Sequence, residues 1–254
     1  MANTPASTVK TTATSLEIIE MLFDRGPVRL EEIETELGLT RSTVHRHLLT
    51  LRDHGYVVTD DGEYGLSLKF LTIGGHLQRR IPAYQMIKSK VDDLAEQTSE
   101  RSQFIVREGR DRVYVYTETG ESRVQTGAYM GRRGPLYSSA AGKAILAHLP
   151  EPKRDSLIDS FEFEGTGPNT ITNSAELRED LAEIRDRGYA LNLEESTGGV
   201  HAIGTCINGR NGEVIGALSV SGPATRLRTD RLENQLPDAV LAAANELELH
   251  IEHT

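Results

Sequence analysis

The sequence has little cysteine and no long apolar run. Cys206 is the single cysteine among 254 residues, which excludes an intrachain disulfide and any zinc site built on paired thiolates. The apolar runs, such as AVLAAA from Ala239, fall far short of the roughly 20 residues that a membrane-spanning helix needs. Residues 1–14 are small and polar without the apolar stretch of a signal peptide, which indicates a disordered arm. We therefore expect a cytoplasmic protein that carries no cofactor and does not associate with membranes.

Positive charge is also scarce. The chain has 28 Lys+Arg against 38 Asp+Glu, a formal net charge of -10. Residues 1–80 hold 9 of the basic and 11 of the acidic residues, so most of the excess acidity lies in the rest of the chain. Such a chain is not attracted to polyanions as a whole, and any contact with nucleic acid must come from a local basic surface.

The N-terminal pattern predicts three helices and a β-hairpin. Apolar residues recur at helical spacing over 15–25, a second short helix ends at Gly38, and a third runs over about 41–54 after a Thr40 cap. The following segment, YVVTDDGEYGLSL, has β-branched and aromatic residues on both sides of an Asp-Asp-Gly turn, as in a hairpin. Together these elements predict a winged helix-turn-helix domain over residues 15–72.

The third helix has a buried stripe and a polar face. At 100° per residue, Val44, Leu48 and Leu51 share one stripe, which we expect to face the core. The polar residues suited to base or phosphate contact are Arg41, Ser42, Thr43, His45, Arg46 and Arg52. Three arginines on a helix can also be a simple solvated face. The preceding helix, the tight turn and the hairpin favour DNA contact instead.

The three histidines of this segment do not predict a metal site. His45 and His47 are two residues apart and face different sides of a helix, while His54 lies too far along it to join His45. We expect His47 to pack beside the core stripe and His45 to reach a phosphate.

The remainder predicts a linker helix and an α+β domain. Residues 73–100 include a helical pattern over 83–98 with an apolar face, which suits a linker and a dimer contact. From residue 101 to 254, three strand-like runs are followed by three helical patterns, three more strand-like runs and a last helix. The strand-like runs are SQFIVREG, DRVYVYTETG, SRVQTGAYM, YALNLE, HAIGTCI and EVIGALSV, and the helices fall at about 139–149, 151–160, 174–187 and 230–252. This order predicts helices packed on a largely antiparallel sheet.

Two patterns in this domain resemble catalytic motifs without completing them. The segment AAGKA lacks a phosphate loop's first glycine, because Tyr137 stands in its place, and an alanine follows the lysine. Cys206 with His201 and an acid of the pair 194–195 suggests a nucleophile, a base and an orienting group. A lone cysteine in an apolar strand is usually inert, and adjacent carboxylates diverge to opposite faces of a strand. We therefore predict that the protein is not an enzyme.

Several segments resemble one family of proteins. LEEIETELGLTRSTVHRHLLTLRDHGYV resembles the DNA-binding motif of the IclR family of transcriptional regulators. GPLYSSAAGKAILAHLP is similar to that family's glycine-proline turn and following helix, GYALNLEESTGGVHAIGTCI to its C-terminal signature, and GALSVSGPATRL to its last strand and turn. These segments occur in the family's order and span nearly all of the chain from Ser15 onward.

The resemblance implies a GAF-like effector-binding domain that holds a small metabolite. Carried over by motif, the pocket residues are Ala140, Ala141, Asn192, Ala202, Ser219 and Ser221. The two alanines begin a helix, whose N-terminus favours a carboxylate. Ser219 and Ser221 are two apart in a strand, so both hydroxyls can face one ligand, although they can also simply satisfy turn backbone.

The resulting prediction is a DNA-binding regulator that senses an organic acid or a sugar-derived acid and controls a catabolic or metabolic operon. We expect a homodimer or homotetramer on a palindromic operator, because a single winged helix reads few base pairs. The alternative is a metabolite-binding module or a small-molecule enzyme that uses an auxiliary winged helix for protein contacts.

Overall fold

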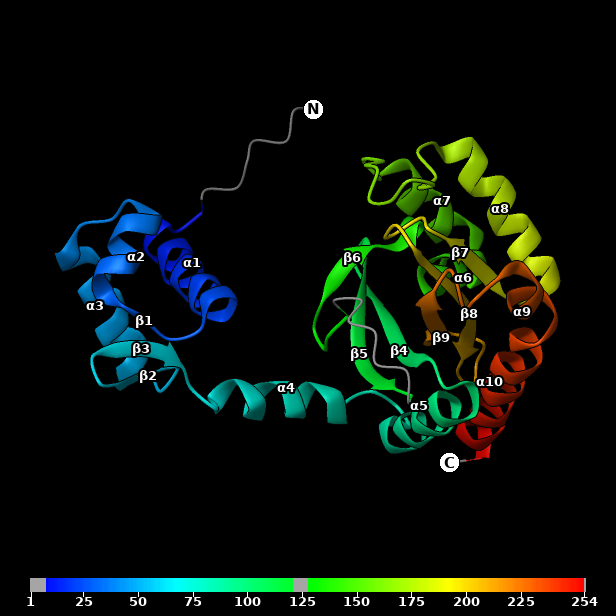
Figure 1. Ribbon diagram of the computed structural model, residues 1–254, viewed down its shortest axis with the longest axis horizontal. Helices are drawn as coiled ribbons and strands as arrows, with labels where there is room; N and C mark the ends of the chain where they lie inside the picture. The colour runs from blue at the N-terminus through cyan, green and yellow to red at the C-terminus, as the bar shows by residue number, and fades with distance from the viewer. Residues whose placement is uncertain (1–7, 121–127, 254) are drawn as a thin grey trace. The chain divides into compact units, whose positions relative to one another are not determined.

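A computed structural model describes residues 8–120 and 128–253. The chain forms two compact units, and the boundary along the chain lies between Arg80 and Ile81 (Figure 1). In the described part of the chain, no helix is both long and apolar enough to cross a membrane. The arm expected over residues 1–14 lies partly outside the described residues. The first helix already begins at Lys10, and the Ser15 hydroxyl bonds to the Thr11 carbonyl, so residues 10–14 are helical, contrary to the expectation.

The first unit has the predicted winged helix-turn-helix fold. Its elements are α1 (Lys10–Arg25), β1 (Val28–Arg29), α2 (Leu30–Leu37), α3 (Arg41–Asp53), β2 (Val57–Asp60) and β3 (Glu63–Leu66). The strands form an antiparallel sheet in the order β1-β3-β2. The hairpin turns at Asp61 and Gly62, whose φ angles of 45° and 79° are the positive values that a tight two-residue hairpin turn requires.

Two helices occupy the segment expected to be one linker over 73–100. They are α4 (Lys69–Arg79) and α5 (Tyr84–Thr98). They are separate because Pro82 has no backbone N–H to continue a helix and Ala83 takes a left-handed conformation, with φ 55°. Helix α4 has no buried residue. Helix α5 is part of the second unit and not a free linker, because Ile87, Val91 and Leu94 are buried in the core of that unit.

The second unit is a six-stranded antiparallel sheet with helices on both faces (Figure 1). The strand order is β6-β5-β4-β9-β8-β7. The strands are β4 (Arg101–Glu108), β5 (Asp111–Thr119), β6 (Arg133–Pro135), β7 (Ala190–Leu193), β8 (Val200–Asn208) and β9 (Val214–Pro223). Most of the predicted strand SRVQTGAYM lies outside the described residues, and β6 begins after it at Arg133.

Each face of this sheet has its own apolar core. One core contains side chains of α6 (Ala140–His148), α7 (Glu151–Asp159) and α8 (Ser174–Arg187), and the other those of α5, α9 (Thr229–Asn234) and α10 (Leu236–His253). Neighbouring strand residues alternate between them, Ile105 in the first and Phe104 in the second. The single helix expected over 230–252 is divided into α9 and α10, because Pro237 suits the first turn of a new helix.

Helix α6 lies unusually close to its neighbours. Its first eight residues are all buried. A Cβ atom added at Gly142 would overlap the carbonyl oxygen of Leu136, and one added at Gly204 of β8 would lie 2.8 Å from the backbone nitrogen of Ala141. Glycine at these two positions therefore allows α6 to approach both the preceding turn and the sheet.

We predict that Gly142→Ala lowers the free energy of unfolding by at least about 1–3 kcal/mol, because the new methyl group meets backbone that cannot rotate away. Urea unfolding of the whole chain measures the change. Gly165→Ala is the matched control, since nothing lies within 4 Å of its added Cβ and its φ is not positive. Equal stability of the two variants would contradict the close approach of α6.

Candidate functional site

Helix α3 presents most of the predicted DNA-binding residues to solvent. Val44, Leu48 and Leu51 are buried, which confirms the predicted core stripe. The exposed members of the predicted set are Arg41, Ser42, His45, Arg46 and Arg52. Thr43 is half-buried, and its hydroxyl lies 2.9 Å from that of the Thr40 cap, so it belongs to the helix start. His47 packs inward, with Nδ1 2.8 Å from the Ser15 hydroxyl.

Arg41 is held by two acids of helix α2. Its NH1 lies 2.8 Å from Glu31 Oε1 and 3.7 Å from Glu34 Oε2. The hydrogen bond from Arg41 lowers the pKa of Glu31. A phosphate that approaches the start of α3 therefore competes with Glu31 for this guanidinium.

The start of α3 lies beside a surface hollow. Its lining residues come from the start of α2, the start of α3 and the hairpin: Arg29, Leu30, Glu31, Arg41, Ser42, His45, Gly62 and Tyr64. The hairpin tip itself carries Asp60, Asp61 and Glu63, which repel phosphate. The positive charge that lines this hollow therefore comes from Arg29 and from Arg41 of helix α3.

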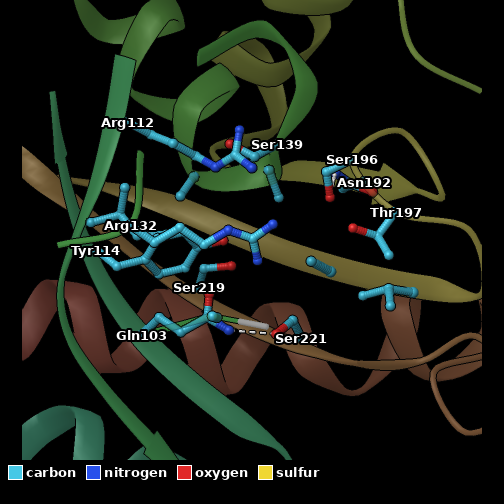
Figure 2. Close-up of a pocket in the computed structure, with 16 residues that line it drawn as sticks. Gln103, Arg112, Tyr114, Arg132, Ser139, Asn192, Ser196, Thr197, Ser219 and Ser221 are labelled. Carbon is cyan, nitrogen blue, oxygen red and sulfur yellow. Dashed lines mark hydrogen bonds between the residues drawn. The ribbon is translucent and has the colours of Figure 1, made fainter. Parts of the chain in front are cut away.

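The six predicted effector residues lie around one cavity in the second unit (Figure 2). They are Ala140, Ala141, Asn192, Ala202, Ser219 and Ser221, contributed by α6, β7, β8 and β9. The cavity volume is about 40 Å³. Since one water occupies roughly 10–15 Å³ on this measure, the space suits a few small groups.

Three of these side chains already have partners in the protein. The Asn192 amide donates to the Ser138 carbonyl at 2.8 Å and accepts from the Glu195 backbone N–H at 3.0 Å, so it holds the loop that follows β7. The Ser219 hydroxyl donates to the Ile203 carbonyl at 2.9 Å, and the Ser221 hydroxyl accepts from Gln103. The two serines therefore bond across the sheet and not to turn backbone, the alternative that the sequence left open.

Polar residues that the sequence interpretation missed also line the cavity. They are Gln103, Arg112, Tyr114, Arg132, Ser139, Ser196 and Thr197. Two arginines line the cavity, and its described lining contains no aspartate or glutamate. The alternation of Arg112 and Tyr114 in DRVYVY was the available signal that both face one side of strand β5.

The N-terminus of α6 supplies further positive potential at the cavity. Ser139 caps this helix, and its hydroxyl accepts from the Gly142 N–H at 3.1 Å. The first residues of the helix, Ala140 and Ala141, line the cavity. A helix N-terminus together with arginine side chains favours an anion.

A buried ion pair lies one turn further along α6. Lys143 Nζ is 2.7 Å from Glu195 Oε1 and 2.8 Å from Asp180 Oδ2, with the lysine side chain 2% exposed. Burial raises the pKa of Glu195, and the attraction to Lys143 opposes that rise. Because the Glu195 backbone also bonds Asn192, the ion pair and the cavity wall share a residue.

The suspected catalytic residues do not form a nucleophilic site. Burial raises the pKa of the Cys206 thiol to about 12, so the thiolate is scarce at neutral pH. The ring Nδ1 of His201 lies 2.7 Å from the Leu227 carbonyl oxygen, and its Nε2 lies 4.0 Å from Glu194. Neither Cys206 nor His201 is among the described residues that line the cavity.

Comparisons with known proteins agree with this arrangement. The chain matches the IclR helix-turn-helix domain over residues 13–61 and the family described as Bacterial transcriptional regulator IclR C-terminal over residues 77–249. It is 36% identical to the probable HTH-type transcriptional regulator ArcR of Halobacterium salinarum, over 94% of this chain and 92% of that protein.

Solved structures share the fold. The IclR structure of Thermotoga maritima has a TM-score of 0.84 and 28% identity, covering 96% of this chain and 99% of that one. An IclR homologue of Microbacterium hydrocarbonoxydans complexed with 4-hydroxybenzoate has a TM-score of 0.78 and 22% identity, covering 96% of this chain and 100% of that one. At that identity the likeness shows the fold alone.

A winged helix-turn-helix unit joined to a separate cavity-bearing unit defines a DNA-binding transcriptional regulator. The chain belongs to the IclR family of transcriptional regulators, whose members are not enzymes.

We predict that Arg46→Ala weakens binding to DNA that the wild-type protein selects from a random library. The Arg46 guanidinium is exposed and makes no ion pair with any described residue, so it is available to a base or a phosphate. The expected loss is about 1–3 kcal/mol of binding free energy. Arg25→Ala, which removes an exposed arginine that pairs with Glu36 outside α3, is the control. Equal DNA affinities of wild type and Arg46→Ala, in gel-shift titrations at one salt concentration, would show that Arg46 does not contact the DNA.

We predict that Lys143→Met lowers the free energy of unfolding at about pH 7.5 by roughly 3–5 kcal/mol, because two carboxylates lose their buried cation. Without Lys143 the pKa of Glu195 rises further. A carboxyl with a raised folded pKa costs stability as the pH rises through that value, so the deficit shrinks as the pH falls toward 5.

Urea unfolding at both pH values measures this effect. Lys153→Met, which removes an exposed lysine of α7, should change stability little at either pH. A deficit for Lys143→Met that is the same at both pH values would contradict the role of the ion pair.

Proposed function

We propose that this regulator acts in the cytoplasm as a sensor of a small organic acid or a sugar-derived acid, and that it controls a catabolic or metabolic operon. Residues 15–72 bind DNA, residues 101–254 bind the effector, and the segment 73–100 connects them. The observation that carries the proposal is the cavity, where Arg112, Arg132 and the start of α6 meet without an acid among the described lining residues. Such a lining favours an anion over a neutral or cationic metabolite.

The DNA side of the proposal rests on helix α3. Its set of Arg41, Ser42, Thr43, His45, Arg46 and Arg52 would face the major groove, with Thr43 acting through the helix start. Two copies of the chain in a homodimer, or four in a homotetramer, would place recognition helices about 34 Å apart on a palindromic operator. Effector binding would change the operator affinity with a coupling free energy of about 1–3 kcal/mol.

The test is a gel-shift titration on DNA selected by the wild-type chain, with and without a panel of short carboxylic acids. The modest cavity volume favours acids such as glycolate, lactate and pyruvate as first probes. We expect at least one acid to change the operator affinity by about 5- to 150-fold. Selected DNA that lacks a two-fold repeat would contradict the dimeric operator. An affinity that no acid changes, at constant ionic strength, would contradict the sensor.

A further inference from the structure

Arg112 is a buried cation without a carboxylate partner among the described residues. Four charged residues of the described chain are buried: Glu100, Arg112, Lys143 and Glu195. Glu100 pairs with Arg226 and Arg231, and Lys143 pairs with Glu195. No described carboxylate lies within 4 Å of Arg112, although the residue is only 7% exposed.

The guanidinium of Arg112 is only partly satisfied by neutral groups. NH1 donates to the Pro135 carbonyl at 2.5 Å and to the Ser138 hydroxyl at 3.2 Å. Nε is buried and makes no hydrogen bond with any residue that the structure describes. A buried ion that lacks a counter-charge costs several kcal/mol, and an unmade charged hydrogen bond adds to that cost. The free protein therefore carries an electrostatic cost that an incoming anion would relieve.

The side chain is also held in place at the cavity wall. A Cβ added at Gly134 of β6 would lie 2.9 Å from Arg112 Cζ, so the backbone of β6 lies directly against the guanidinium. The Tyr114 ring centroid is 5.9 Å from the same Cζ atom. Figure 2 shows the side chain extending from β5 toward Ser139, the cap of α6. An anion in this part of the cavity would lie between an oriented guanidinium and a helix N-terminus.

We propose that Arg112 is the binding residue that pairs with the carboxylate of the effector, an inference that rests on the effector cavity of the proposed function. A guanidinium offers parallel N–H groups that match the two oxygens of a carboxylate. Arg112 thereby selects acids against their neutral amides of equal size. The pocket residues expected from the sequence, which are small or already hydrogen-bonded, shape the cavity around this pair.

The first test uses the protein without any ligand. Arg112→Met replaces the unpaired cation by an apolar side chain of similar length. We expect its urea midpoint to equal or exceed that of wild type, because a buried ion that lacks its partner is replaced by an apolar group. A structural arginine would behave in the opposite way, and a clearly lower midpoint for both Arg112→Met and Arg112→Lys would overturn the proposal.

The second test measures binding by titration calorimetry with three acid and amide pairs: glycolate and glycolamide, lactate and lactamide, pyruvate and pyruvamide. We expect wild type to bind at least one acid and to bind its amide at least about tenfold more weakly. For that acid, Arg112→Gln should raise the Kd about 30-fold or more, the effect of leaving a buried charge unpaired. Arg112→Lys should recover part of the loss.

Two further variants separate charge from position. Gly134→Ala keeps the arginine but displaces its guanidinium, so it should also weaken acid binding. Arg107→Gln on the adjacent strand β4 removes an arginine outside the described cavity lining and should leave the Kd unchanged. Binding of an amide as tightly as its acid, an unchanged Kd for Arg112→Gln, or no binding of any of the three acids would overturn the assignment.

Gel shifts with the same chains distinguish this inference from the proposed function. The DNA affinity of wild type should change when the acid is added, and the DNA affinity of Arg112→Gln should not. If the acid changes the DNA affinity of wild type and of Arg112→Gln equally, the proposed role of Arg112 is wrong and the proposed sensor function is supported. If wild type binds the acid through Arg112 but the acid does not change its DNA affinity, the proposed sensor function is wrong and the role of Arg112 in binding is supported.

Discussion

The close burial of helix α6 is the constraint on which the rest of the second unit depends. Gly142 lets the helix start directly against Leu136, and Gly204 lets the sheet approach its first turn. These two contacts bring the N-terminus of α6 to the cavity wall instead of to solvent. Because an exposed helix end is screened by water and a buried one is not, the same packing strengthens the attraction of this site for an anion.

Polar contacts then extend from α6 to the far wall of the cavity. Lys143 holds Glu195, whose backbone N–H bonds the Asn192 amide. That amide donates to the Ser138 carbonyl, and the Ser138 hydroxyl accepts from Arg112. The two buried cations of the described chain are thus the ends of one hydrogen-bonded series. Lys143 is neutralised by Glu195 and Asp180, whereas Arg112 has no carboxylate among the described residues. The positive charge is therefore balanced at α6 and unbalanced at the cavity.

The sequence predicted elements better than it predicted contacts. The period of 3.6 residues identified Val44, Leu48 and Leu51 as buried, because one face of α3 meets one core. That period does not apply to strand β5. The alternation in DRVYVY places Arg112 and Tyr114 on one face, but because both faces of the sheet are covered it does not tell which face lines a cavity. The family resemblance gathered the small pocket residues but not the arginines. A local break was also missed, because Pro237 acts on backbone within the otherwise continuous helical pattern expected over 230–252.

Charge is used differently in the two units. In the second unit, the buried Arg112 has no counter-charge among the described residues, and its low-dielectric surroundings strengthen its attraction for an anion, so one arginine is enough to favour an anion. In the first unit the cations are exposed. Arg41 already forms an ion pair with Glu31, and the hairpin tip is acidic. Exposed ion pairs contribute little and are screened by salt, so a phosphate backbone with its dense charge can displace Glu31. The net charge of -10 does not attract the chain to DNA. Binding through one helix therefore requires many specific contacts between that helix and the DNA.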